Sequence, residues 1–177
     1  ARLNLAVMPD LSKRRLATLL QRIQRHLPSL DLTLSDPETP ADCRLTLDVL
    51  RREDEIFLPL WEEDYVLCVP IDHPLALRER VELHELQAHD FIECPPCEAH
   101  QQTLGLLACD RITLNLVAKA QSKGLVMALV LAGAGISFLP DGLIEEEPAL
   151  RAVPLAGPRM FRRIGLCYPA RQTLSPA

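Results

Sequence analysis

The sequence predicts an α/β fold with a mostly parallel sheet that is covered by helices on both faces. The first observation is that strand-like and helix-like segments alternate along the chain, as they do in such folds. The second is the opening, where apolar residues alternate in 3–7, recur at helical spacing in 16–27 and alternate again in 30–34. The third is a composition of 48% hydrophobic and 24% charged residues, which is typical of a globular chain. The opening therefore predicts a parallel strand–helix–strand unit.

The first helix has clear start and stop signals. Ser12 precedes it, and a serine side chain at that position can accept a hydrogen bond from a free amide of the first turn. Pro28 follows its last periodic residue. Residues 35–41 contain two prolines and are expected to form a loop, and the apolar alternation in 45–49 predicts a third strand.

An acidic triplet interrupts the next apolar region. Residues 57–61 and 65–69 are predicted as two strands, with Glu62-Glu63-Asp64 as the turn between them. Consecutive carboxylates in a turn do not converge on one substrate atom, so we expect a solvated surface rather than an acid–base pair.

The second half of the chain begins the alternation again. A near-continuous apolar helix follows Ser122, and Gly133 and Gly135 mark its end because glycine tolerates the left-handed backbone of a helix stop. The expected elements are short helices at 81–86 and 98–108, a long apolar helix at 123–131, and strands at 91–92, 112–116, 136–139, 153–155 and 164–168.

Charge and hydropathy exclude several classes of protein. The net charge of −5 argues against nucleic-acid binding by this chain itself, since that affinity comes from clustered lysines and arginines. No segment approaches the roughly 20 apolar residues that cross a bilayer. The first residues lack the layout of a signal peptide, so we expect a cytoplasmic chain without membrane contact.

Catalytic and cofactor motifs are missing from the sequence. It contains no nucleophile elbow, phosphate-binding glycine loop or HExxH helix, so we expect neither an enzyme nor a cofactor. Cys94-Pro95-Pro96-Cys97 has the spacing of a redox or metal pair, but a structural zinc site needs four ligands and no second pair exists. No metal is expected. A thiol oxidoreductase remains an alternative, because a helix start favours the thiolate form.

Four phrases of the sequence resemble one known family. They are RHLPSLDLTL, LPLWEEDYVLCVPIDHPLA, VELHELQAHDFI and GLVMALVLAGAGISFLPDGL. Together they resemble the effector-binding domain of LysR-type transcriptional regulators, and they cover most of the chain. The last two are specific in combination. The segment 35–41 is shorter than its counterpart in the family, where a helix usually precedes the next strand.

The resemblance implies two Rossmann-like lobes joined by two crossing segments, as in type 2 periplasmic binding proteins. Lobe I would comprise 1–70 plus 163–177, and lobe II would comprise 71–162. A small-molecule effector would be held in the cleft between the lobes. The resemblance also implies a dimer or tetramer of the full-length protein, which would contact DNA only through an N-terminal helix-turn-helix domain that is absent from this chain.

The resemblance also supplies the candidate effector-binding residues. The alternative for Ser12 and Ser122 is a purely structural role as helix caps. An aspartate at position 10 would repel a carboxylate, which favours a neutral or cationic effector. The candidates are Asp10, Leu11, Ser12, Thr39, Pro95, Pro96, Cys97 and Ser122.

Two alternatives stay open within the same fold. Cys97 and Cys109 are a candidate redox switch, because the peroxide-sensing branch of the family uses two cysteines in about this stretch, although the spacing here differs. The simpler expectation for Cys43, Cys68, Cys109 and Cys167, which lie on or beside apolar stretches, is that they are small core residues. A transport-type solute-binding protein would share the two-lobed fold.

Overall fold

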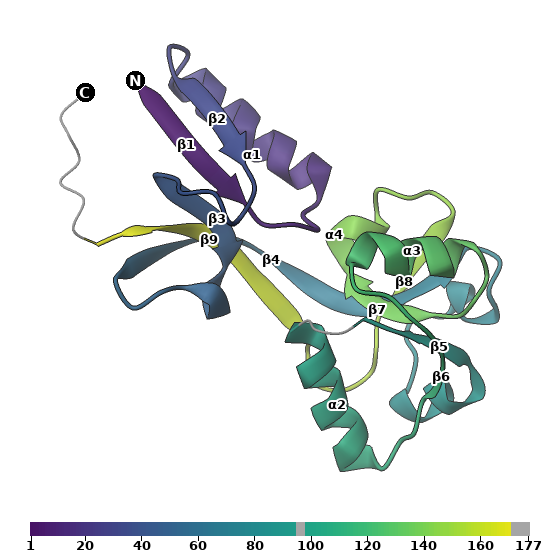
Figure 1. Cartoon of the computed structure of the whole chain (residues 1–177). Coiled ribbons are helices and arrows are strands. Elements are labelled where there is room, and N and C mark those ends of the chain that lie inside the picture. The colour runs from purple at the N-terminus through teal and green to yellow at the C-terminus, as the bar shows by residue number, and fades with distance from the viewer. Residues whose placement is uncertain (95–97, 171–177) are drawn as a thin grey trace. The chain divides into compact units, whose positions relative to one another are not determined.

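The computed structural model describes residues 1–94 and 98–170, which form two compact units (Figure 1). Unit 1 contains Ala1–Glu63 and the C-terminal segment from Arg162, and unit 2 contains Asp64–Phe161. The chain therefore leaves unit 1 after Glu63 and returns to it at Arg162. The lobe boundary predicted at residue 70 lies at the end of a strand of unit 2, and the return predicted at residue 163 lies one residue beyond Arg162.

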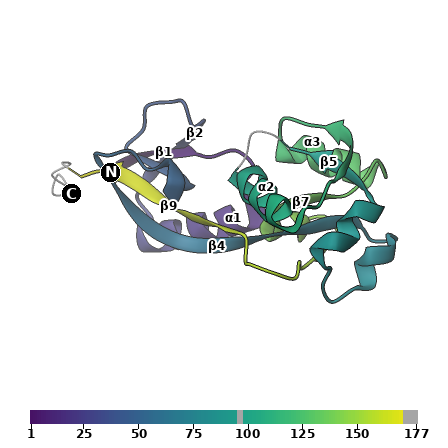
Figure 2. The same ribbon diagram turned by 90° about the horizontal axis from the view of Figure 1, so that it is seen from below.

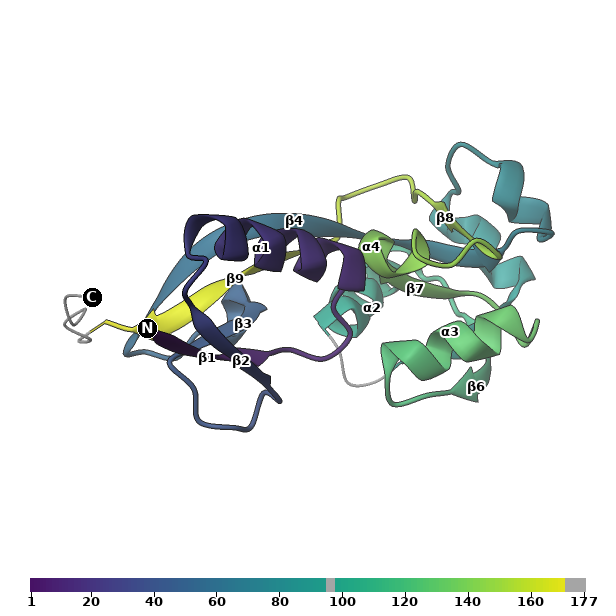
Figure 3. The ribbon, with the colours of Figure 1, turned by 90° about the horizontal axis from the view of Figure 1, so that it is seen from above.

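Unit 1 is a mixed sheet with one helix on its apolar face. Strand β1 (Arg2–Val7) pairs in parallel with β2 (Asp31–Ser35) on one side and with β3 (Cys43–Leu47) on the other. Strand β9 (Phe161–Pro169) runs antiparallel to β3. Helix α1 (Lys13–His26) lies along β1 and β2 (Figures 1 and 3). The core beneath it contains Leu5, Leu11, Leu45, Leu47 and Ile164, with Leu16 and Leu19 of α1 packed against them.

The connection from β2 to β3 needs no helix because the two strands are staggered. β2 pairs with Arg2–Ala6 of β1, whereas β3 pairs with Leu5–Val7. From Ser35, level with Ala6, to Cys43, level with Leu5, the loop 36–42 therefore retraces only about one residue of strand length, roughly 3 Å, while it crosses β1. At its end the amide of Asp42 donates to the Asn4 carbonyl at 2.9 Å. The loop predicted at 35–41 is thus confirmed in its position, and its shortness is accommodated by the stagger.

The predicted turn at the acidic triplet is wrong. Glu55–Pro70 form one continuous strand, β4, which follows the 3₁₀ turn η1 (Asp48–Leu50) and can be traced without a break in Figure 2. Glu63 is 1% exposed, as buried as the core residues that alternate with it at Tyr65 and Leu67. The strand continues because the charge of Glu63 is matched by a buried arginine, which the sequence pattern did not reveal.

Unit 2 places its strands in the order β6-β5-β7-β4-β8. β5 and β6 are parallel, a parallel bridge joins Phe91 to Ile136 beside β7, and β7 and β8 are both antiparallel to β4. Its strands are β5 (Asp90–Glu93), β6 (Asn115–Lys119), β7 (Ser137–Pro140) and β8 (Leu150–Val153). Its helices are α2 (Glu98–Asp110), α3 (Lys123–Leu131) and α4 (Asp141–Ile144), with 3₁₀ segments η2 (Pro74–Leu77) and η3 (Leu83–Ala88).

Helices α2 and α3 pack on opposite faces of this sheet (Figure 1). Val126 and Val130 of α3 are fully buried in a core with Ile92 and Leu139. Leu106 of α2 packs against the other core, which contains the aromatic rings of unit 2. The predicted helix 123–131 is confirmed, and Gly133 ends it at φ 79°. Unit 2 is thus a sheet covered by helices on both faces, as the α/β prediction requires.

The strand predicted at 112–116 lies further along the chain, at Asn115–Lys119. Helix α2 continues to Asp110, and Arg111 then reverses the backbone with φ 55°. Ile112 and Leu114 pack against the core from the loop rather than from a strand. Their alternation therefore reflected partial burial without strand pairing.

Among the helices of residues 1–94 and 98–170, none has the length and apolar character that a membrane span requires.

Candidate functional site

The loop between β1 and α1 holds three of the predicted site residues in one fixed conformation. Asp10 has φ 58°, which is uncommon for a residue other than glycine. Ser12 is fully buried, and its Oγ accepts a hydrogen bond from the Arg15 amide at 3.2 Å. The predicted cap is confirmed, whereas the effector contact of Asp10, Leu11 and Ser12 stays a prediction.

A buried arginine anchors this loop from strand β9. The Arg162 Nη2 group donates to the Asp10 carbonyl oxygen at 3.0 Å, and its Nε donates to Glu63 Oε2 at 2.7 Å. The side chains of Arg162 and Glu63 are 2% and 0% exposed. One guanidinium therefore joins the loop to the two points where the chain leaves and re-enters unit 1.

Other groups complete the surroundings of the Glu63 carboxylate. Trp61 Nε1 donates to Glu63 Oε1 at 3.2 Å, and the Arg15 guanidinium lies 3.6 Å from the same oxygen. Burying a charge is costly unless it is paired and hydrogen-bonded, and this carboxylate is both. Arg162 Nη1 is also buried, and no described residue accepts a hydrogen bond from it.

Sequence reasoning missed both Glu63 and Arg162. The alternation of side chains along the strands gave a signal. Glu63 faces the same side of β4 as Tyr65 and Leu67, and Arg162 faces the same side of β9 as Ile164. Inward-facing residues alternate along a strand, so both charges could have been expected to face the core if each strand had been read as continuous.

Thr39 lies in a different part of unit 1 from the β1–α1 loop. Its amide donates to the Asp36 carbonyl at 3.0 Å, and its side chain is exposed beside a cavity of about 320 Å³. Arg44, Arg52 and Glu55 also line that cavity. None of Asp10, Leu11 and Ser12 lines it, so the structure does not bring Thr39 together with them.

Ser122 caps α3. Its Oγ accepts a hydrogen bond from the Leu125 amide at 3.2 Å, which confirms the capping alternative. The side chain is half-buried, so the capping bond leaves its hydroxyl hydrogen as a further donor. Any effector contact by Ser122 stays a prediction.

The cysteine predictions separate into buried and exposed thiols. Burial raises the pKa of Cys68 to about 12, and burial together with the Asp42 charge raises the pKa of Cys43 to about 11. Burial and the Glu55 charge also raise the pKa of Cys167. These three thiols stay protonated at neutral pH, which suits core residues. Cys109 is exposed on α2, contrary to the expected core position.

The candidates Pro95, Pro96 and Cys97 lie outside the described residues. A Cys97–Cys109 switch therefore has no described geometry. Among the described residues, no group of three or more histidine, cysteine and acidic side chains could hold a metal ion.

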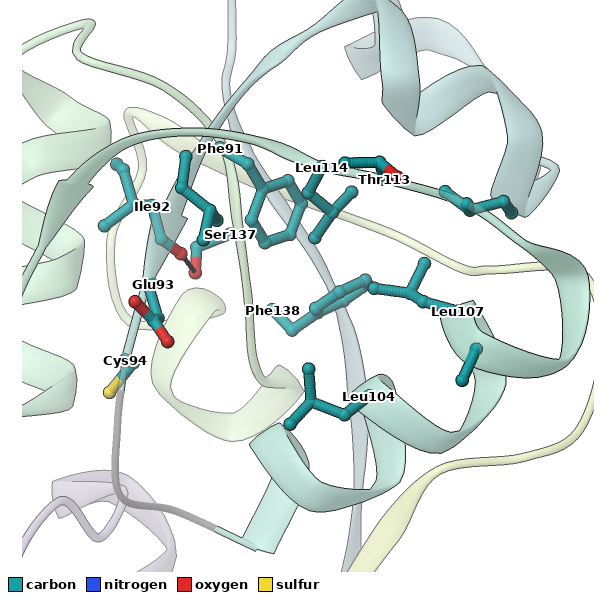
Figure 4. Close-up of a pocket in the computed structure, with 13 residues that line it drawn as sticks. Phe91, Ile92, Glu93, Cys94, Leu104, Leu107, Thr113, Leu114, Ser137 and Phe138 are labelled. Atoms are coloured by element: carbon teal, nitrogen blue, oxygen red, sulfur yellow. Dashed lines mark hydrogen bonds between the residues drawn. The ribbon is translucent and has the colours of Figure 1, made fainter.

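Unit 2 encloses a cavity that the sequence analysis did not anticipate (Figure 4). It measures about 360 Å³ and lies between helix α2 and the sheet. Phe91 and Phe138 form one wall, with ring centroids 5.0 Å apart and ring planes inclined by 51°. Leu104 and Leu107 of α2 face them, and Glu93 lies at the end next to Cys94. The sequence feature that could have indicated this cavity is the i, i+3, i+4 spacing of Leu104, Leu107 and Ala108, which places the three side chains on one face of α2.

The comparisons with known proteins agree on one family. The model of the LysR substrate binding domain matches residues 1–177. The chain is 26% identical over 181 residues to the hydrogen peroxide-inducible genes activator of Dickeya chrysanthemi, covering 94% of this chain and 59% of that protein. It is 31% identical over 121 residues to the uncharacterized HTH-type transcriptional regulator YybE of Bacillus subtilis, covering 68% of this chain and 41% of that protein.

A solved structure gives the same result for the fold. The CcmR regulatory domain of Synechocystis PCC6803, solved in complex with 2-PG, superposes with a TM-score of 0.80 at 19% identity. The alignment covers 98% of this chain and 90% of that one. The predicted two-lobed, type 2 periplasmic-binding-protein-like fold is therefore confirmed. The chain belongs to the LysR substrate-binding domain family.

Proposed function

We propose that this chain is the sensory part of a LysR-type regulator and that a small effector contacts the β1–α1 loop of unit 1. The observation that carries the proposal is the anchoring of that loop, since Arg162 holds the Asp10 carbonyl and Ser12 caps α1. A loop with a fixed backbone presents its groups to a ligand with little ordering cost. The bound 2-PG in the CcmR regulatory domain supports a small-molecule ligand for this fold.

The charges around the loop favour a neutral or cationic effector. Arg162 is a buried cation beside Asp10, but Glu63 already pairs with it at 2.7 Å. An organic acid that approached Asp10 closely would be repelled by its carboxylate. Ser122, at the start of α3 in unit 2, stays a second candidate for effector contact.

Titration of the ¹⁵N-labelled chain tests this assignment. The panel would contain an amine (putrescine), a neutral sugar (glucose) and a carboxylate (benzoate), followed by larger sets of the same three classes. We expect the amide signals of Leu11, Ser12 and Lys13 to shift with a neutral or cationic compound. Asp10→Asn should weaken amine binding and improve carboxylate binding, whereas the control Asp36→Asn, in an exposed turn of the same unit, should change neither. Compounds that bind without shifting these three amides would contradict the proposal.

The activity of the whole regulator is a further part of the proposal. The chain spans 41% and 59% of the two curated relatives described above. YybE is named as an HTH-type (helix-turn-helix) transcriptional regulator. That name supports DNA binding through a segment outside this chain. We propose a cytoplasmic, non-catalytic homo-oligomer in which effector binding changes the free-energy difference between two arrangements of the attached DNA-binding domains.

The peroxide-responsive relatives support a second candidate function, redox sensing through Cys97 and Cys109. Hydrogen peroxide would oxidise one thiolate to a sulfenic acid, which the second thiol would convert to a disulfide with loss of water. We expect mass spectrometry after peroxide treatment to detect that disulfide if the candidate is right. Cys43→Ser and Cys68→Ser serve as controls, since both thiols have raised pKa values. Overoxidation of Cys97 without a Cys97–Cys109 disulfide would rule the switch out.

A further inference from the structure

We propose that the cavity beneath helix α2 of unit 2 is a binding site for a small uncharged aromatic molecule of one or two rings. This site is separate from the β1–α1 loop and does not depend on the function proposed there. All of its lining residues belong to unit 2 and lie between Phe91 and Phe138.

The size of the cavity is the first argument. An apolar cavity of about 150 Å³ in an engineered protein core is large enough to hold benzene. The cavity here measures about 360 Å³, within the range of small-molecule pockets. A two-ring aromatic molecule therefore fits it better than a single ring does.

The walls select an aromatic ligand. Phe91 and Phe138 are only 3% and 8% exposed, and their tilted rings offer both an edge and a face to a third ring. Leu107 closes the opposite side from α2. Aliphatic and aromatic carbon thus surrounds most of the volume.

The mouth is also apolar. Leu104 is 48% exposed and Leu116 is 52% exposed, and both line the cavity. Large apolar side chains at the rim of a pocket are typical of a binding surface. A bound molecule would remove both leucines from water, which gives the site a hydrophobic driving force.

The polar groups set the charge and the orientation of the ligand. Glu93 is the one charged side chain among the described residues that line the cavity, and its carboxylate would repel an anion. The Ser137 hydroxyl donates to the Ile92 carbonyl at 2.8 Å, so it can offer a ligand only its lone pairs. Glu93 and Ser137 therefore favour a neutral ligand that carries a hydroxyl or N–H donor.

Calorimetric titration with a matched pair of probes tests the site. 2-Naphthol is neutral at pH 7 and carries one hydroxyl, and 2-naphthoate has the same rings with a negative charge. We expect 2-naphthol to bind the 177-residue chain at least about tenfold more tightly than 2-naphthoate. Glu93→Gln should narrow that difference, because it removes the charge and keeps an acceptor.

A filling substitution locates the binding. Ala108 lines the cavity from α2 and is exposed, so Ala108→Phe should fill the mouth and weaken 2-naphthol binding by about tenfold or more. Gln102→Phe is the control, since Gln102 is exposed on the same helix and does not line the cavity. Thr113→Trp closes the site from the loop side and replaces Ala108→Phe if that variant does not fold. Absence of 2-naphthol binding, or equal binding by the filled and control variants, would overturn the proposal.

Discussion

The cores of unit 1 and unit 2 differ in what they contain. Unit 1 encloses a charged pair, Glu63 with Arg162, and packs so tightly that a Cβ on Gly165 would lie 2.2 Å from the Leu58 carbonyl oxygen. Unit 2 has a largely apolar interior with a cavity of about 360 Å³, and its close packing is local, as at Gly135, where a Cβ would lie 2.8 Å from the Asp90 carbonyl oxygen. Unit 1 anchors a loop through a buried charged pair, whereas unit 2 has room beneath α2 for another molecule.

Breaking the buried ion pair should have the largest effect on stability. Arg162→Leu leaves Glu63 buried without its main partner, which costs about 3–5 kcal/mol of unfolding free energy. Arg163→Leu is the control on the same strand, because the Arg163 pairs with Glu62 and Asp48 are partly exposed and such pairs contribute at most about 1 kcal/mol. Urea unfolding measures both variants.

The double variant separates pairing from packing in the same measurement. Replacing both charges by leucine should recover much of the loss, since no unpaired charge then remains. A cost below about 1 kcal/mol for Arg162→Leu alone would mean that Glu63 is solvated in solution.

Gly165→Ala should be the next most damaging change. The added methyl group would overlap the Leu58 carbonyl and the Phe57 ring, at 2.2 and 2.5 Å. Overpacking of this kind costs about 1–3 kcal/mol, and more where backbone must shift. A shift of the urea midpoint to lower concentration would be the expected result, and an unchanged midpoint would show that β4 and β9 can separate enough at Gly165 to accept a methyl group.

The two serine caps offer a smaller and more direct comparison between the units. Ser12 and Ser122 each accept a capping bond at 3.2 Å, but Ser12 is fully buried whereas Ser122 is half-buried. Ser12→Ala should therefore cost about 1–2 kcal/mol and Ser122→Ala about 0.5–1 kcal/mol. The reverse order, measured by thermal unfolding, would show that the deeper burial of Ser12 does not strengthen its cap.

Gly105→Ala should give the smallest effect, and in the opposite direction. Alanine is favoured over glycine inside a helix by about 0.5–1 kcal/mol, and the added methyl group has open space. Gly133→Ala is the control, because φ 79° penalises alanine there although the space is equally open. A loss of stability in Gly105→Ala would show that α2 packs more closely than described.

Local sequence signals predicted the elements whose ends are chemically marked. Ser12 and Ser122 both cap helices, and Gly133 ends the helix expected at 123–131. The pattern failed where burial occurs without strand pairing, as at Ile112 and Leu114, which are partly buried in a loop. It also failed at Glu63, because acidic residues are mostly exposed to solvent and this one is buried against an arginine distant in the sequence.

The candidate site was predicted only in part. Asp10, Leu11 and Ser12 lie together because they are consecutive residues before a helix start. Thr39 lines a cavity that Asp10, Leu11 and Ser12 do not line, and its effector contact stays a prediction. Arg162, which is separated from Asp10 by 152 residues, was not predicted at all.

The sequence by itself determined the family, the alternation of helices and strands, and the capped helix starts, because these depend on residues close together in the chain. Only the tertiary structure decided that Glu63 and Arg162 pair in the core of unit 1 and that α2 leaves a cavity in unit 2. Both features depend on how side chains distant in sequence fill a common volume. Periodicity reports which side of an element is buried, and it carries no information about the partner on that side.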